Sequence, residues 1–136
     1  MSPRRGKTAA VDPVPPALHE LEAEVMEELW KSGEAPVRVV MDALNKRASK
    51  KRAYTTYMTI MARLHTKGTL VRRREGKTDF YAPRYDRDQY MALRAQSEVE
   101  GLVAQYGDVA LSNFAQQMAG LDPARRRALQ RLARKA

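Results

Sequence analysis

The chain has 136 residues, of which 25 are Lys or Arg, 16 are Asp or Glu and none is Cys, and its formal net charge at pH 7 is +9. The hydrophobic content of 43% is enough for one domain core, so wholesale disorder is not expected, and the lack of cysteine excludes disulfides, thiolate metal sites and cysteine nucleophiles. No apolar run reaches the length of a membrane span, so we expect a cytoplasmic protein with no direct membrane association and a polyanionic partner.

Residues 1–17 are rich in proline and are predicted to form a flexible arm, in which Arg4, Arg5 and Lys7 are candidates for weak phosphate contacts. No apolar core follows these charges, so the arm is not expected to be a secretory signal. A first helix is predicted over residues 18–31, because apolar residues recur there at spacings of three and four. Its solvated acidic face is expected to hold Glu20, Glu24, Glu27 and Glu28.

The next elements follow the order of a winged helix-turn-helix. Residues 35–37 are predicted to be extended, a second helix covers residues 37–45, the basic run 46–52 is a loop, and a third helix covers residues 53–67 before Gly68. Two extended runs, 69–74 and 77–82, flank Glu75-Gly76, and a glycine at such a reversal is typical of a hairpin. Three helices followed by a hairpin indicate a winged helix-turn-helix domain.

The chain is predicted to be helical again from Asp86, which forms a capping box with Gln89. Gly107-Asp108 begins another helix, and Asp122-Pro123 opens a basic last helix. These helices are amphipathic but too short to enclose a core, so we expect their apolar stripes to pack against a second copy of the chain. The residues assigned to that dimer contact are Val99, Leu102, Val103, Tyr106, Leu111, Phe114 and Met118.

The predicted fold is therefore mainly α with a small β wing (α+β). It consists of the arm at residues 1–17, a winged-helix DNA-binding domain at residues 18–85 and a helical dimerisation region at residues 86–136. The positive charge belongs to the winged helix, because residues 46–77 hold eleven basic side chains and one acidic side chain, a net charge of +10. The rest of the chain is close to neutral.

The third helix and the wing are the predicted DNA-reading elements. On a helical wheel, Tyr57, Ile60, Met61 and Leu64 fall in the core sector, and the opposite face is built from threonine, alanine and arginine. Such small hydrogen-bonding side chains suit a helix that enters the major groove, although a surface helix can also tolerate threonine. In the wing, strand alternation sends Arg72 and Arg74 to one face and Arg73 to the other, for phosphate contact or to block edge pairing. The predicted DNA contacts are Arg52, Thr55, Thr56, Thr59, Arg63, Lys67, Arg72, Arg73 and Lys77.

No catalytic site, metal site or cofactor is predicted. His19 opens a string that superficially resembles a zinc-protease motif, but Ala23 stands where the second histidine would be. There is no Gly-rich phosphate loop, no Ser-His-Asp set and no paired carboxylates, so an enzyme is not expected.

The sequence resembles the penicillinase-repressor family, which comprises β-lactamase and methicillin-resistance repressors and copper-responsive relatives. The resemblance is carried by LHELEAEVMEELW at residues 18–30, AYTTYMTIMARLHTKG at residues 53–68 and Tyr81-Ala82-Pro83. Tyr57 departs from the family pattern, in which a small aliphatic residue is usual. The resemblance implies a homodimeric winged-helix transcriptional repressor that binds a dyad-symmetric operator overlapping a promoter.

In antibiotic-responsive members, a membrane metalloprotease sensor triggers cleavage of the repressor at an Asn-Phe bond in the dimerisation region. The resemblance therefore suggests Asn113-Phe114 as the cleaved bond, although Phe114 also fits as a core anchor on its stripe. The copper-responsive branch uses a C-terminal cysteine pair, which this chain lacks. Two alternatives stay open: a non-specific architectural DNA-binding protein, and a winged-helix module that docks proteins through its acidic first helix.

Overall fold

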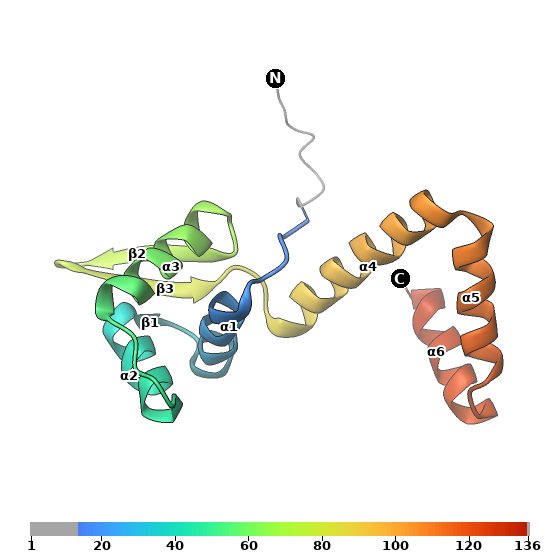
Figure 1. The fold of residues 1–136 in the computed structure, drawn as a ribbon, viewed down its shortest axis with the longest axis horizontal. Coiled ribbons are helices and arrows are strands. Elements are labelled where there is room, and N and C mark those ends of the chain that lie inside the picture. Colours follow the sequence, from blue (N-terminus) through green and yellow to red (C-terminus); the bar gives the residue numbers. More distant parts are fainter. Residues whose placement is uncertain (1–13, 136) are drawn as a thin grey trace, which may run out of the picture. The chain divides into compact units, whose positions relative to one another are not determined.

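The computed structural model describes residues 14–135, so most of the predicted arm lies outside the described residues. The elements are α1 (Glu20–Ser32), β1 (Ala35–Pro36), α2 (Val37–Arg47), α3 (Tyr54–Thr66), β2 (Leu70–Glu75), β3 (Thr78–Pro83), α4 (Arg87–Tyr106), α5 (Asp108–Ala119) and α6 (Pro123–Lys135) (Figure 1). The predicted winged helix followed by C-terminal helices is confirmed. No helix in the described part is both long enough and apolar enough to cross a bilayer.

The chain forms two compact units, one ending at Ala95 and the other beginning at Gln96. In the first unit, α1, α2 and α3 surround one hydrophobic core that the small sheet closes. The third helix supplies three of the most deeply buried side chains, so its orientation is fixed by the core. The core side chains are Val25, Met26, Leu29, Ala35, Val37, Val40, Leu44, Tyr57, Met61, Leu64, Leu70 and Tyr81.

The wing is a three-stranded antiparallel sheet with the strand order β1-β3-β2. The predicted extended segment at residue 35 thus becomes β1, which pairs with β3 and adds a strand to the predicted hairpin. The tip differs from the prediction by one residue, because the turn consists of Gly76 and Lys77. Gly76 has a φ of 63°, a conformation that costs glycine little and other residues more. Lys77 therefore lies at the tip itself.

One of the glutamates predicted to be solvated is buried. Glu28 is only 9% exposed, and its carboxylate accepts a hydrogen bond from Arg47 at 3.3 Å. The partner of Glu28, Arg47, is the last residue of α2. The prediction that a loop begins at residue 46 is therefore wrong by two residues. The basic loop between α2 and α3 is therefore shorter than predicted.

A second glutamate of α1, Glu22, is 1% exposed and ties α1 to the end of α3. Its carboxylate accepts hydrogen bonds from the His19 amide and from Lys67 Nζ, each at 3.0 Å. Burial by itself raises the pKa of Glu22, but these hydrogen bonds and the charge of Lys67 outweigh burial and hold the pKa below its ordinary value. Glu22 is therefore a buried anion whose partner, Lys67, directly follows the helix that carries the predicted reading face.

The first turns of α4 pack on the winged helix. Asp86 and Gln89 form the predicted capping box, with hydrogen bonds of 2.8 and 2.9 Å. The indole of Trp30 donates to the Tyr85 carbonyl at 2.9 Å and lies 5.3 Å from the Tyr90 ring, centroid to centroid. The Tyr90 hydroxyl in turn donates to the Pro16 carbonyl at 2.9 Å. These contacts place the division between the units inside α4, beyond its N-terminal end.

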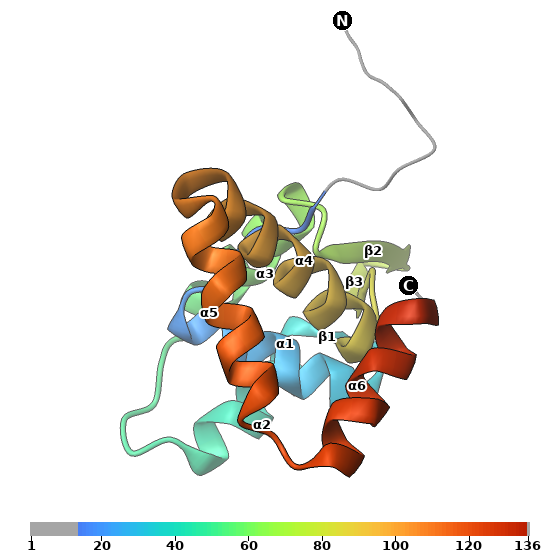
Figure 2. The ribbon, with the colours of Figure 1, turned by 90° about the vertical axis from the view of Figure 1, so that its right-hand side faces the viewer.

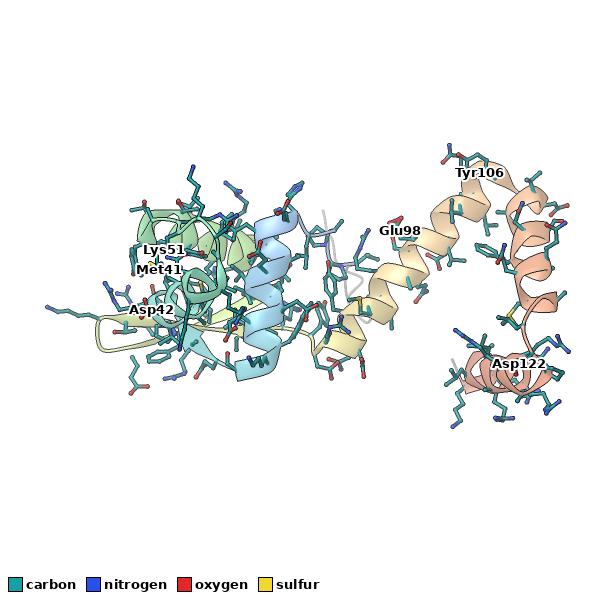
Figure 3. All side chains as sticks on the ribbon, turned by 60° about the horizontal axis from the view of Figure 1, so that its bottom comes forward. Met41, Asp42, Lys51, Glu98, Tyr106 and Asp122 are labelled. Carbon is teal, nitrogen blue, oxygen red and sulfur yellow. The ribbon has the colours of Figure 1, made fainter. Side chains whose placement is uncertain are left out.

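The second unit consists of the end of α4 with α5 and α6. Gly107, at a φ of 60°, separates α4 from α5, and Tyr106 precedes it at the end of α4 (Figure 3). The chain reverses direction between α5 and α6 (Figure 2), and Asp122 caps α6 by accepting from the Arg125 amide at 2.9 Å. Among the described residues from 96 onward, only Ala110 is buried. This unit does not enclose a core of its own.

Candidate nucleic-acid interface

The N-terminal end of α3 is fixed by the side chain of Asn45, at the end of α2. The amide group of Asn45 donates to the Arg52 carbonyl at 2.9 Å, and its oxygen accepts from the Arg52 amide at 3.0 Å. The same oxygen accepts from the hydroxyl of the fully buried Tyr57 at 2.8 Å. Asn45 therefore satisfies the hydroxyl of Tyr57 inside the core.

The outward face of α3 agrees with the helical-wheel prediction. Tyr57, Met61 and Leu64 are buried, and Ile60 is partly buried against the same core. The opposite face exposes uncharged hydroxyl side chains together with one guanidinium group. The exposed residues of this face are Thr55, Thr56, Thr59, Arg63 and Thr66.

The two predicted DNA contacts that flank this face, Arg52 and Lys67, are both constrained by other parts of the winged helix. Arg52 is half-buried, and its backbone is held by Asn45. Lys67 follows the last residue of α3 and is paired with the buried Glu22 carboxylate. A contact between Lys67 and a phosphate would therefore compete with an internal ion pair, which sequence spacing alone did not reveal.

The wing arginines separate by face as strand alternation predicted. Arg73 pairs with Glu34 and Glu75 and lies 4.8 Å from the centre of the Phe80 ring, whereas Arg74 pairs with Asp79 at 2.9 Å. The hydrogen bond from Arg73 lowers the pKa of Glu34, and the hydrogen bond from Arg74 lowers the pKa of Asp79. Arg72 and Lys77 are exposed and form no ion pair with any described residue. These two cations are the most available of the wing.

A groove that helical spacing alone did not predict lies between α3, α2 and the wing. It has a volume of about 470 Å³, and it is lined by Arg38 and Val39 of α2, Tyr54 and Met58 of α3, and Lys77 at the wing tip. Val39, Tyr54 and Met58 are 51%, 40% and 43% exposed. The spacing of Tyr54 and Met58, one helical turn apart and off the core sector, was the signal available in the sequence.

The residues assigned to the dimer contact all lie in the second unit, on the end of α4 and on α5. Val99, Leu102, Tyr106 and Leu111 are 42–54% exposed. Val103, Phe114 and Met118 are half-buried. Asn113 is exposed, and its side chain donates to the Val109 carbonyl at 2.9 Å. Leu102, Tyr106, Asn113 and Phe114 line a shallow hollow of about 200 Å³ together with Val109 and Ala110.

No group of three or more potential metal-ligating side chains occurs among residues 14–135. The described part of the chain thus offers a polar and cationic surface on α3 and the wing, and an unpartnered apolar surface on α4 and α5.

This arrangement agrees with what comparison with known proteins finds. The model of the family described as penicillinase repressor matches residues 18–135. The transcriptional regulator BlaI of Mycobacterium tuberculosis is 40% identical over 76 residues, which are 55% of this chain and 54% of the relative. The penicillinase repressor of Bacillus licheniformis is 29% identical over 82 residues, 60% of this chain and 62% of the relative.

A solved structure, the solution structure of the DNA-binding domain of the repressor BlaI, is 29% identical. The similarity covers 59% of this chain and 94% of that one, with a TM-score of 0.49. The alignments with the two curated relatives thus span only part of their length, whereas the family model spans nearly the whole of this chain. By that match, the chain belongs to the penicillinase repressor family.

Proposed function

We propose that this protein is a homodimeric, sequence-specific transcriptional repressor that binds a dyad-symmetric DNA operator. The observation that carries the proposal is the exposed face of α3, where Thr55, Thr59 and Arg63 stand beside a cationic wing. Membership of the penicillinase repressor family supports it, and the Bacillus licheniformis relative is itself named a penicillinase repressor. A repressor must reach the DNA inside the cell, so we propose a cytoplasmic location.

The exposed face of α3 and the wing are suited to different contacts with DNA. Threonine offers a hydroxyl group to a base edge and a methyl group to thymine, and Arg63 can form a bidentate contact with guanine or a phosphate. Arg52, Thr56 and Lys67 border this face, while Arg72, Arg73 and Lys77 supply charge from the wing. Phosphate contacts position the protein on DNA, and base contacts specify the sequence.

Dimerisation is the second part of the proposal, and it concerns the helical region at residues 86–136. The apolar side chains Leu102, Tyr106 and Leu111 are exposed in a unit that lacks its own core, and burying them against a second copy would remove this apolar area from water. Two linked winged helices bind two half-sites with an effective-concentration advantage that one winged helix lacks. A dyad operator follows from the twofold symmetry of such a dimer.

Release from DNA by cleavage is the third part. We propose that a membrane metalloprotease sensor leads to cleavage of the bond between Asn113 and Phe114. Support comes from the exposure of Asn113 on α5 and from Phe114, which lines the same hollow as Leu102 and Tyr106. Cleavage there would remove the end of α5 and all of α6, and would weaken the surface on which dimerisation depends.

The first experiment is selection of bound sequences from random duplex DNA, followed by footprinting of the selected site. A repressor protects two half-sites related by a dyad, whereas an architectural protein gives uniform protection without an enriched sequence. A protein-docking module responds little to DNA. The replacements Thr55→Ala and Thr59→Ala should relax the preference at particular base pairs, and Thr8→Ala in the arm serves as the matched control.

The cleavage proposal has a separate test. A chain that ends at Asn113 should bind the selected operator much more weakly than the full chain, because it loses the linkage between half-sites. Equal affinity of the two chains for the full operator would exclude release by cleavage while leaving sequence-specific binding intact. Binding of both chains to a single half-site is the control, and there they should be similar.

A further inference from the structure

The groove beside α3 concentrates exposed apolar surface. Of the described residues of the winged-helix unit, six large hydrophobic side chains are exposed: Val14, Val39, Tyr54, Met58, Val71 and Met91. Three of the six, Val39, Tyr54 and Met58, line this single groove. Exposed apolar side chains scattered singly need no explanation, but a cluster beside a predicted binding face does.

Charged side chains of both signs line the groove beside its apolar ones. Lys77 stands at the wing tip, and on α2 the guanidinium of Arg38 lies over the Tyr54 ring, 5.4 Å from its centre. Two carboxylates also line the groove, Asp79, which pairs with Arg74, and Asp42. Carboxylates repel phosphates, so the DNA backbone is favoured beside Arg38 and Lys77, and the apolar side chains are left for base edges.

The groove continues directly into the threonine face. Met58 precedes Thr59, and Tyr54 precedes Thr55, so each lies about 100° around the helix from its threonine neighbour, toward the wing. A helix that enters the major groove with these threonines brings the exposed side chains of Met58 and Tyr54 to the flank of the same contact. The one apolar group that base pairs present in the major groove is the C5-methyl of thymine.

We propose that Met58, supported by Tyr54, is a specificity-determining residue that recognises thymine by burying its C5-methyl group. The inference rests on the proposed function and names part of the sequence it reads. The thioether side chain of methionine is flexible and polarisable, so it can adapt to a methyl group at the edge of the groove. The Arg38 guanidinium holds the Tyr54 ring in place one turn earlier and brings a cation next to it.

The test combines protein variants with a change of one methyl group in DNA. Each thymine of a selected half-site is replaced in turn by deoxyuridine, which removes the methyl and keeps every hydrogen-bonding group. Dissociation constants for the full-length protein are measured by fluorescence anisotropy at one fixed salt concentration. For the wild-type chain, deoxyuridine at one or two positions should weaken binding about fourfold, the equivalent of one buried methyl group.

The Met58→Ala variant should show no such loss at those positions, so that its affinities for thymine and deoxyuridine sites are equal. Met58→Leu keeps an apolar side chain, so deoxyuridine should still weaken its binding at those positions. Met91→Ala is the matched control, because Met91 is 42% exposed on α4 and lies outside the groove, and it should behave as the wild type.

Two results would overturn the inference: no deoxyuridine effect at any thymine in the wild type, or an undiminished effect in Met58→Ala. Both leave the proposed function standing, because the wild type has already selected a sequence. Failure of the wild type to enrich any sequence would instead overturn the proposed function, and this inference with it. Since Met58 is on the surface, all variants are expected to keep the wild-type thermal unfolding midpoint.

Discussion

The hydrogen bonds of Asn45 make a quantitative prediction about the stability of the winged helix. Asn45→Ala removes three hydrogen bonds, two to the Arg52 backbone and one to the Tyr57 hydroxyl. The Tyr57 hydroxyl belongs to a fully buried residue, and leaving it without a partner costs about 1–3 kcal/mol. The Arg52 backbone lies in a loop and can turn to water, so its loss is smaller, and we expect a total of about 2–4 kcal/mol.

The partner variant tests whether the orphaned hydroxyl is the cause. Tyr57→Phe alone should cost about 1 kcal/mol, because the Asn45 oxygen keeps its bond to the Arg52 amide. In the double variant no hydroxyl is left unpaired, so its cost should fall short of the sum of the single costs by about 1 kcal/mol or more.

The assay is urea unfolding followed by the fluorescence of Trp30, the only tryptophan, which lies in the winged-helix unit. Two protein concentrations separate winged-helix stability from any contribution of self-association. Asn113→Ala, at the only other asparagine and on the surface, is the control and should stay within about 0.5 kcal/mol of the wild type. Strict additivity of the Asn45 and Tyr57 costs would refute the reasoning.

Three further predictions concern the acid response, the wing and the apolar stripe. Because the pKa of Glu22 is lower in the folded chain than in the unfolded chain, its ion pair stabilises the fold fully above the unfolded pKa. This stabilisation is lost as the pH falls through the lower, folded pKa. The free energy of unfolding measured across acidic pH should therefore depend less on pH in Glu22→Gln. Replacing Arg72 or Lys77 with Ala should reduce the slope of log affinity against log salt by about 0.9 for binding to one half-site, and by about 1.8 for a dimer on its operator. Arg74→Ala, which removes the partner of Asp79, should change the slope less. Leu102→Asp should shift the chain toward monomer in sedimentation velocity and leave Trp30 fluorescence unchanged. Gln130→Asp on α6 is the control, and it should not change the proportion of monomer.

Elements with strong local signals could be predicted from the sequence. The caps at Asp86 and Asp122, the break at Gly107 and the apolar spacing of α3 are local signals, because each depends on residues within one or two turns. The alternation of the wing arginines is equally local, since side chains on a strand point to opposite faces in turn.

Features that depend on distant partners could not be predicted. Glu22 and Glu28 belong to one acidic helix, and the cations that pair with them, Lys67 and Arg47, lie at the C-terminal ends of two other helices. The two extra residues of α2 have the same origin. The groove could not be predicted either, because it is formed by residues of α2, α3 and the wing together, and on α3 alone Tyr54 and Met58 are ordinary apolar positions.

The anchoring of α4 implies that one continuous helix has two different stabilities. Its first turns are held by Trp30, Tyr90 and the Pro16 carbonyl, so their amide protons should exchange only when the winged helix opens. The turns around Leu102 and Tyr106 have no such anchor in one chain, and their protection would come from a second chain. Hydrogen exchange along α4 should therefore be independent of protein concentration at the start of the helix and slow with rising concentration at its end.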